Sequence, residues 1–139
     1  MLLSGALDGL GRLWTRAGKL QKVFKGHAGP VLAIKFSLDG KHAVSASVDG
    51  KCILWHIESG DMVRSYAHHK GAAMDAAWRS SDIFATAGTD GKIMFCSIKE
   101  TTPQKVISAH AVSFLSCDER RRTRSRGLVG YQSHLLVSG

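Results

Sequence analysis

The stretch SASVDGKCILW, residues 45–55, appears in three related copies and decides the fold of the chain. The other two copies are SGALDGLGRLW, residues 4–14, and TAGTDGKIMFC, residues 86–96. Successive copies are 41 residues apart, and a fixed period of this size indicates one supersecondary unit repeated along the chain. An Asp-Gly pair between two apolar runs favours a tight hairpin turn, because both residues tolerate positive φ. Each copy therefore predicts a strand, a turn and a second strand.

The composition places the chain in the globular class. Hydrophobic residues make up 44% of the 139 residues, and no segment approaches the roughly 20 apolar residues of a membrane span. The net charge is +8, and five arginines lie between Asp118 and Arg126, so the basic charge is concentrated late in the sequence. Three cysteines without a close pair argue against a disulfide framework or a CxxC zinc site, and they favour a reducing, intracellular location.

Further strands are expected on either side of the hairpins, separated by Gly, Pro and Asp turns. Beyond the hairpin at residues 2–14, the expected strands are residues 20–24, 31–36, 42–47, 51–57, 62–67, 73–78, 83–88, 92–98 and 104–108. Three of these segments, VLAIKF, CILWHI and IMFCSI, are nearly continuously apolar. Such strands are expected to be buried on both faces, which a sheet stacked between similar sheets would achieve.

Four short antiparallel strands in each repeat match the blade of a β-propeller. In the second repeat, Gly26-His27 precedes the first strand and Trp55 closes the third. On these residues the chain resembles the WD-repeat family. The Asp that usually follows the Trp is replaced by Thr15 and His56, so the dipeptide itself is absent at both positions.

Four longer motifs carry a narrower resemblance, and they are DGLGRLWTRAG (8–18), KGHAGPVLAIKF (25–36), AAMDAAWRSSDIFATAGTD (72–90) and KETTPQKVISAH (99–110). On these motifs the chain resembles the carboxy-terminal propeller of the transducin beta-like 1 family from Leu3 to His110. Members of that family are corepressor subunits of histone deacetylase complexes. Cys96 stands where a Trp is expected, a replacement that is more specific than the Gly-His and Asp-Gly elements.

The expected architecture is an all-β partial β-propeller of about two and a half four-stranded antiparallel blades, followed by a non-matching basic tail. The expected units are a partial blade at 1–27, a full blade at 28–68, a full blade lacking its Trp at 69–109, and a diverged tail at 110–139. The segment RRRTRSR, residues 120–126, fits a nuclear import or nucleic-acid patch, a solvated basic tail, or sequence that was never selected to fold. The third interpretation is favoured, because the segment begins where the repeat loses register, and a frameshift or an unspliced intron would produce this. So few blades are not expected to close a propeller alone, because closure takes about four to eight.

A histidine, a hydroxyl residue and an aspartate recur at the same places in the second and third repeats. These residue types can form a hydrolase triad, but active sites are seldom duplicated in every repeat, so no catalytic residue and no enzyme are expected. The WD resemblance implies instead a structural tetrad that also includes a Trp indole, with Ser47 as an alternative to Ser45. Cys96 cannot donate as an indole does, so the third tetrad is expected to be incomplete. The expected tetrad residues are His27, Ser45, Asp49 and Trp55 in the second repeat, and His69, Thr86 and Asp90 in the third.

No cofactor and no metal ion are expected. Cys52 and His56 share one face of a strand, because side chains alternate along it. Two ligands are too few for a structural zinc site, which takes four. A buried thiol and a surface imidazole are the expected roles of these residues.

The resemblance implies a non-catalytic protein-interaction scaffold, similar to a transcriptional corepressor subunit that binds histone deacetylase or chromatin components in the nucleus. The alternative is a WD-repeat adaptor of another complex, such as a ubiquitin-ligase substrate receptor, for which a cytoplasmic location is equally open. The resemblance points to the loops carrying Lys51, Lys70 and Lys92 as a partner-binding face. No membrane partner is expected. A basic cluster in the tail would attract nucleic acid non-specifically, and it consists of Arg120, Arg121, Arg122, Arg124 and Arg126.

Overall fold

The computed structural model describes the backbone of residues 1–108, 114–118, 122–125, 128–131 and 134–138, and the side chains of residues 1–108. Within these ranges the regular secondary structure consists of β-strands, and every strand pair is antiparallel. None of these residues belongs to a helix that could cross a membrane. The all-β prediction is confirmed.

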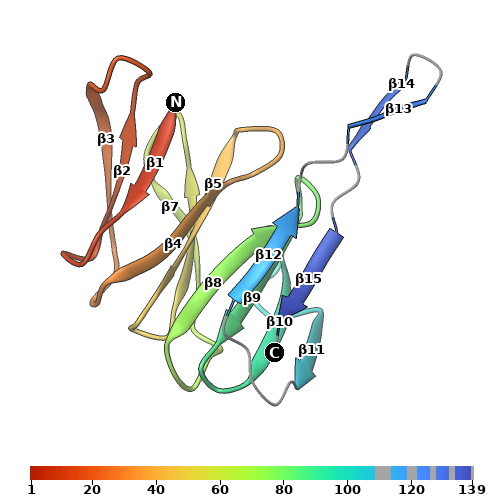
Figure 1. Ribbon diagram of the computed structural model, residues 1–139. Helices are drawn as coiled ribbons and strands as arrows, with labels where there is room; N and C mark the ends of the chain where they lie inside the picture. Colours follow the sequence, from red (N-terminus) through yellow and green to blue (C-terminus); the bar gives the residue numbers. More distant parts are fainter. Residues whose placement is uncertain (109–113, 119–121, 126–127, 132–133, 139) are drawn as a thin grey trace.

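Three sheets follow one another along the chain, fanned out side by side in Figure 1. The first consists of β1 (Leu2–Gly5), β2 (Leu10–Trp14) and β3 (Leu20–Lys25). The second consists of β4 (Val31–Phe36), β5 (His42–Ser47), β6 (Cys52–His56) and β7 (Met62–Tyr66). The third consists of β8 (Ala73–Trp78), β9 (Ile83–Gly88), β10 (Lys92–Ser97) and β11 (Lys105–Ser108). Strands adjacent in sequence are adjacent in each sheet, as in the blades of a propeller.

The Asp-Gly pairs form the turns that the repeated stretch predicts. Gly9, Gly50 and Gly91 have φ angles of 81°, 82° and 72°, in the left-handed region that side chains with a Cβ disfavour. These turns connect β1 to β2, β5 to β6, and β9 to β10. The same local chemistry therefore reverses the chain at the same place in each repeat.

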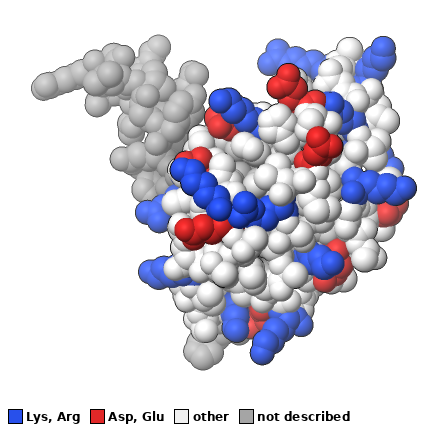
Figure 2. Space-filling view, turned by 180° about the vertical axis from the view of Figure 1, so that it is seen from behind, with Lys and Arg blue, Asp and Glu red and all other residues white. Residues whose placement is uncertain are grey.

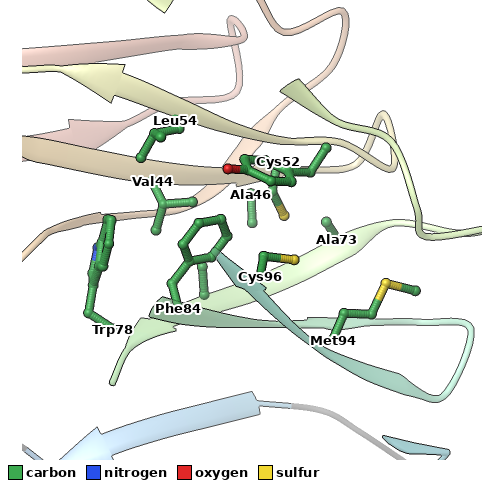
Figure 3. Packing of buried hydrophobic residues seen from close by; sticks show 11 residues of the cluster. Val44, Ala46, Cys52, Leu54, Ala73, Trp78, Phe84, Met94 and Cys96 are labelled. Atoms are coloured by element: carbon green, nitrogen blue, oxygen red, sulfur yellow. The ribbon is translucent and has the colours of Figure 1, made fainter. Parts of the chain in front are cut away.

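The second and third sheets pack face to face through an apolar core. Figure 3 shows Val44 and Leu54 of the second sheet facing Trp78 and Phe84 of the third. The Trp78 and Phe84 rings also contact each other, with centroids 5.2 Å apart. The buried residues of this core are Val44, Ala46, Cys52, Leu54, Tyr66, Ala73, Ala76, Trp78, Phe84, Met94 and Cys96.

The opposite face of the second sheet packs against the first sheet. This second core contains Leu13 and Phe24 of the first sheet, with Ile53 and Trp55 of β6. Side chains on β6 thus alternate between two cores, which confirms the prediction that this strand is buried on both faces. The stacking of sheets on both sides of β6 is that of a partial β-propeller.

The same prediction is wrong for VLAIKF, which forms β4. Leu32 is 41% exposed and Lys35 is also exposed. β4 is an edge strand of its sheet, with β5 as its neighbour on one side. Its side chains therefore lie at the border of the stack, where the adjacent sheets cover them incompletely.

The remaining described strands follow the third sheet. β12 (Phe114–Asp118) pairs with β15 (His134–Ser138), and β13 (Arg122–Ser125) pairs with β14 (Leu128–Tyr131). β12 lies beside β8, as β8 lies beside β4. Arg120, Arg121 and Arg126 of the basic cluster lie outside the described residues, as do the side chains of β13.

Candidate functional site

The second sheet brings His27, Ser45, Asp49 and Trp55 into one hydrogen-bonded network. His27 comes from the loop between β3 and β4, and its Nδ1 lies 3.0 Å from Asp49 Oδ2 in the β5–β6 turn. His27 Nε2 lies 2.7 Å from Ser45 Oγ on β5, and Trp55 Nε1 on β6 donates to the same oxygen at 2.8 Å. If His27 Nδ1–H donates to the carboxylate, Nε2 is free to accept the Ser45 hydroxyl hydrogen. Each polar group in the network then has a partner.

Asp49 also receives two backbone hydrogen bonds. The amide of Ala28 donates to Oδ2 at 3.0 Å, and the amide of Lys51 donates to Oδ1 at 2.9 Å. Burial raises the pKa of Asp49, but these two bonds and the contact with His27 more than offset it and lower the pKa below its usual value. The carboxylate therefore joins the loop before β4 to the β5–β6 turn.

The third sheet repeats this arrangement with His69, Thr86 and Asp90. His69 Nδ1 lies 3.0 Å from Asp90 Oδ1, and His69 Nε2 lies 2.9 Å from Thr86 Oγ1. The amides of Lys70 and Lys92 donate to the Asp90 carboxylate at 3.0 and 3.2 Å. Cys96 lies on β10 and is buried. Cys96 occupies the sequence position of Trp14 and Trp55, and a thiol is a much weaker donor than an indole N–H.

The first sheet holds a different set of partners. Trp14 Nε1 donates to Ser4 Oγ at 2.8 Å, which reproduces the Trp55–Ser45 contact. Asp8, however, pairs with Arg12 of the same hairpin at 2.5 Å. Its carboxylate is about half exposed, so the ion pair contributes little stability.

Several polar contacts were not predicted from the sequence. Ser47, the proposed alternative to Ser45, donates instead to the Gly29 carbonyl at 3.1 Å. The Tyr66 hydroxyl of the second sheet donates to the Ser97 carbonyl of the third at 2.8 Å. The backbone donors to Asp49 and Asp90 were also missed, although an amide two residues after a turn aspartate is the usual donor of an Asx turn.

The network has little capacity for hydrolytic chemistry. His27 and Asp49 side chains are 1% and 8% exposed, and Ser45 is buried beneath them. The Ser45 oxygen already contacts both an imidazole and an indole, so a substrate carbonyl has no open approach to it. The arrangement fastens a loop, a strand and a turn together.

The cysteine thiols are buried between the second and third sheets (Figure 3). Burial raises the pKa of Cys52, and it raises that of Cys96 to about 12. Both thiols therefore stay protonated at neutral pH, a state that is poor for metal binding or nucleophilic attack. His56 lies beside His42, with ring centroids 5.6 Å apart. The described residues contain no group of three or more metal-ligating side chains.

The three predicted lysines lie at the end of the sheets where the Asp-Gly turns are. Lys51 and Lys70 are exposed, and Lys92 is partly buried. The Asp49–Gly50 turn rests on the loop of the next repeat, because a Cβ added at Gly50 would lie 3.0 Å from the Gly71 carbonyl oxygen. Lys51 and Lys70 are thus carried by two loops in direct contact.

Comparison with known proteins agrees with the blade geometry. Residues 18–56 match the family model described as WD domain, G-beta repeat. This segment is a WD repeat. Over 110 residues the chain is 32% identical to the F-box-like/WD repeat-containing protein TBL1X of Mus musculus, an overlap of 79% of this chain and 21% of that protein. The predicted resemblance of this WD-repeat segment to the transducin beta-like 1 family is confirmed.

Two further relatives are similar to this chain over a comparable length. The WD40 repeat-containing protein HOS15 of Arabidopsis thaliana is 33% identical over 110 residues, which cover 79% of this chain and 18% of that protein. The SIR4-interacting protein SIF2 of Saccharomyces cerevisiae is 28% identical over 124 residues, which cover 78% of this chain and 23% of that protein. The chain spans about a fifth of the length of these relatives.

The stability of the WD-repeat segment is expected to fall when the pH drops below about 4. Asp49 and Asp90 have lowered pKa values in the folded chain, because the bonds to their carboxylates outweigh burial, which acts in the opposite direction. The unfolded chain binds protons first, near the usual pKa of about 3.9, so the stabilisation present above that pH is lost as the pH falls through the folded values. Urea unfolding at a series of pH values measures this loss.

The double variant Asp49→Asn, Asp90→Asn should lose stability at pH 7 and show a shallower decline in acid. Asp8 and Asp39 also have lowered pKa values, so part of the decline should remain. The matched control is Asp61→Asn, an exposed side chain whose carboxylate accepts no hydrogen bond within the described residues. An equal pH dependence in the control and the double variant would contradict the assignment.

Proposed function

We propose that the chain is a non-catalytic protein-interaction scaffold, similar to a transcriptional corepressor subunit of histone deacetylase complexes and located in the nucleus. The observation that carries this proposal is the duplicated buried network. His27 contacts Asp49 in the second blade, and His69 contacts Asp90 in the third. The buried polar residues of this network are hydrogen-bonded to one another and stabilise the fold. Contacts with partners are therefore expected from the exposed loops. The name of the yeast relative, a SIR4-interacting protein, agrees with a role in binding other proteins.

The proposed partner-binding face is formed by the turn and loop that carry Lys51 and Lys70, together with Lys92. The backbone amides of these residues are held by Asp49 and Asp90, so the backbone beneath each lysine is fixed before a partner binds. Such pre-organisation reduces the entropy lost on binding. Charge alone does not mark a surface, because Figure 2 shows basic and acidic residues interspersed on one whole face of the molecule.

The proposal predicts specific recovery of histone deacetylase or corepressor components when the chain is immobilised and exposed to nuclear extract. The triple variant Lys51→Glu, Lys70→Glu, Lys92→Glu should lose most of this recovery, measured by quantitative mass spectrometry. The control variant Lys19→Glu, Lys99→Glu, Lys105→Glu makes the same charge change at other exposed positions and should retain it.

Two results would favour other functions. Recovery of ubiquitin-ligase subunits in place of deacetylase components would favour the adaptor, an alternative supported by the F-box-like description of the mammalian relative. Labelling by a fluorophosphonate serine-hydrolase probe, abolished in a folded Ser45→Ala variant, would show an enzyme instead of a scaffold.

A further inference from the structure

A groove lies between the first and second sheets, at the end of the strands away from Lys51. Its volume is about 720 Å³, within the range of roughly 300–1,000 Å³ that is usual for ligand sites. The pairing of β5 with β6 fixes its position, because His42 pairs with His56 at one end and Ala46 pairs with Cys52 at the other. Lys41 and Ile57 line the groove and lie next to the His42–His56 pair. Lys51 lies next to the Ala46–Cys52 pair, at the opposite end of the two strands.

The floor of the groove is apolar. Leu13 of β2 and Ile57 after β6 line it, and they are 2% and 7% exposed. Both belong to the core that also contains Trp55, so the floor is rigid and continuous with the folded interior. Aliphatic side chains in such a floor favour an apolar side chain of a ligand.

The rim of the groove carries two lysines and one glutamate. Lys22 pairs with Leu13 across β2 and β3, and Lys41 is held in place by the bond from the Ile57 amide to its carbonyl at 2.9 Å. Glu58 lies on the same rim. Within residues 1–108 none of these three charged groups forms an ion pair. The rim therefore has an excess of unpaired positive charge beside an apolar floor.

The stem of Lys22 is also placed by its neighbours. A Cβ added at Gly60 would lie 3.2 Å from Lys22 Cδ, so the aliphatic part of this lysine crosses the turn that follows β6. Its ammonium group can then reach past the turn while the stem stays packed. This placement puts a cation at the border of the apolar floor.

We propose that this groove binds an acidic peptide segment of a partner protein, with one apolar side chain on Leu13 and Ile57 and carboxylates beside Lys22 and Lys41. Charge complementarity favours an acidic segment, since two cations face one anion. A peptide is favoured over a nucleic acid because Leu13 and Ile57 make the floor aliphatic, and His56 is the one ring among the lining residues on which a base could stack. This surface is separate from the lysine face proposed above, so it would give the scaffold a second contact.

The test is fluorescence anisotropy with the full chain and a fluorescein-labelled peptide of three Asp-Leu repeats. Saturable binding is expected, and it should weaken as salt is added, because exposed charges are screened. The variant Lys22→Glu, Lys41→Glu should weaken binding about tenfold or more, since each attraction becomes a repulsion. Circular dichroism should show the wild-type fold in this variant, because both substitutions are on the rim.

Two peptides and one protein variant complete the experiment. A peptide of three Lys-Leu repeats should bind much more weakly, and so should a peptide of three Asp-Ser repeats, which lacks the apolar side chain. The variant Lys51→Glu, Lys70→Glu should bind the Asp-Leu peptide as the wild type does. This last result separates the groove from the proposed function, because these two substitutions belong to the triple variant that is expected to lose most of its recovery of nuclear partners.

The proposal is overturned if the Asp-Leu peptide does not saturate, if it binds the Lys22→Glu, Lys41→Glu variant with unchanged affinity, or if the three peptides bind equally. An equal loss of binding in the Lys51→Glu, Lys70→Glu variant would also overturn it, because the peptide would then be held by non-specific charge.

Discussion

Replacing Trp55 by alanine should lower the free energy of unfolding by about 3–5 kcal/mol, the usual cost of truncating a buried aromatic side chain. Trp55 is 2% exposed and lies between the first and second sheets, with its ring centroid 5.4 Å from that of Phe24. The substitution also removes the indole N–H that donates to Ser45. The loss therefore combines a cavity with an altered buried network. Urea unfolding, followed by circular dichroism, measures it.

Trp14→Ala is the matched control, because Trp14 occupies the corresponding position in the first repeat and makes the corresponding bond to Ser4. Trp14 is only partly buried, so its removal should cost clearly less than that of Trp55. Limited proteolysis should show the same order, with Trp55→Ala cleaved faster. Equal destabilisation by the two substitutions would contradict the assignment of Trp55 to a core between two blades.

Local chemistry explains why the strand order could be predicted from the sequence. The Asp49-Gly50 pair and the residues beside it are enough to predict a tight turn. The period of 41 residues predicts the same turn in the other repeats. The alternation of Ile53 and Leu54 between two cores follows from strand geometry once sheets lie on both sides. The turn and the alternation of side chains each depend on residues close together in the sequence, and the repeat period extends them along the chain.

The exposure of β4 could not be predicted in this way. The apolar character of VLAIKF indicates burial, but whether Leu32 is covered depends on how far the neighbouring sheets extend past an edge strand. That extent is a property of the packing angle between sheets. Apolar composition alone does not distinguish a central strand from an edge strand of the stack.

The candidate sites show the same division between local and non-local information. The contact of His27 with Asp49 joins residues 22 positions apart, and the resemblance to WD repeats was needed to expect it. The acceptor for Ser47 was not foreseen, because the Gly29 carbonyl is brought close only when the loop before β4 folds back over β5. The groove beside Lys22 is formed by two sheets together, so no single repeat carries a signal for it.

Contact between successive blades should make Gly50 far more sensitive to substitution than its conformation alone requires. Gly50 has a φ of 82°, which costs a residue with a Cβ about 1–2 kcal/mol. A Cβ at this position would also lie 3.0 Å from the Gly71 carbonyl oxygen and 3.2 Å from that of His69. Both oxygens belong to the backbone of the next repeat, so they cannot rotate away as a side chain would. Gly50→Ala should therefore lower the free energy of unfolding by about 2–4 kcal/mol, adding the cost of overpacking to that of the left-handed turn.

Gly40→Ala measures the conformational cost of the left-handed turn alone. Gly40 has a φ of 72°, but a Cβ added there would meet nothing within 4 Å. The conformational penalty should be similar at the two positions, so the difference between the two variants in urea unfolding reports the contact with the next repeat. The same contact recurs at Gly9, where an added Cβ would lie 3.1 Å from the Gly29 carbonyl oxygen, and Gly9→Ala should behave like Gly50→Ala. An equal decrease in the free energy of unfolding in all three variants would contradict this prediction. Glycine would then be needed at these turns for its backbone conformation alone, and not for contact with the following blade.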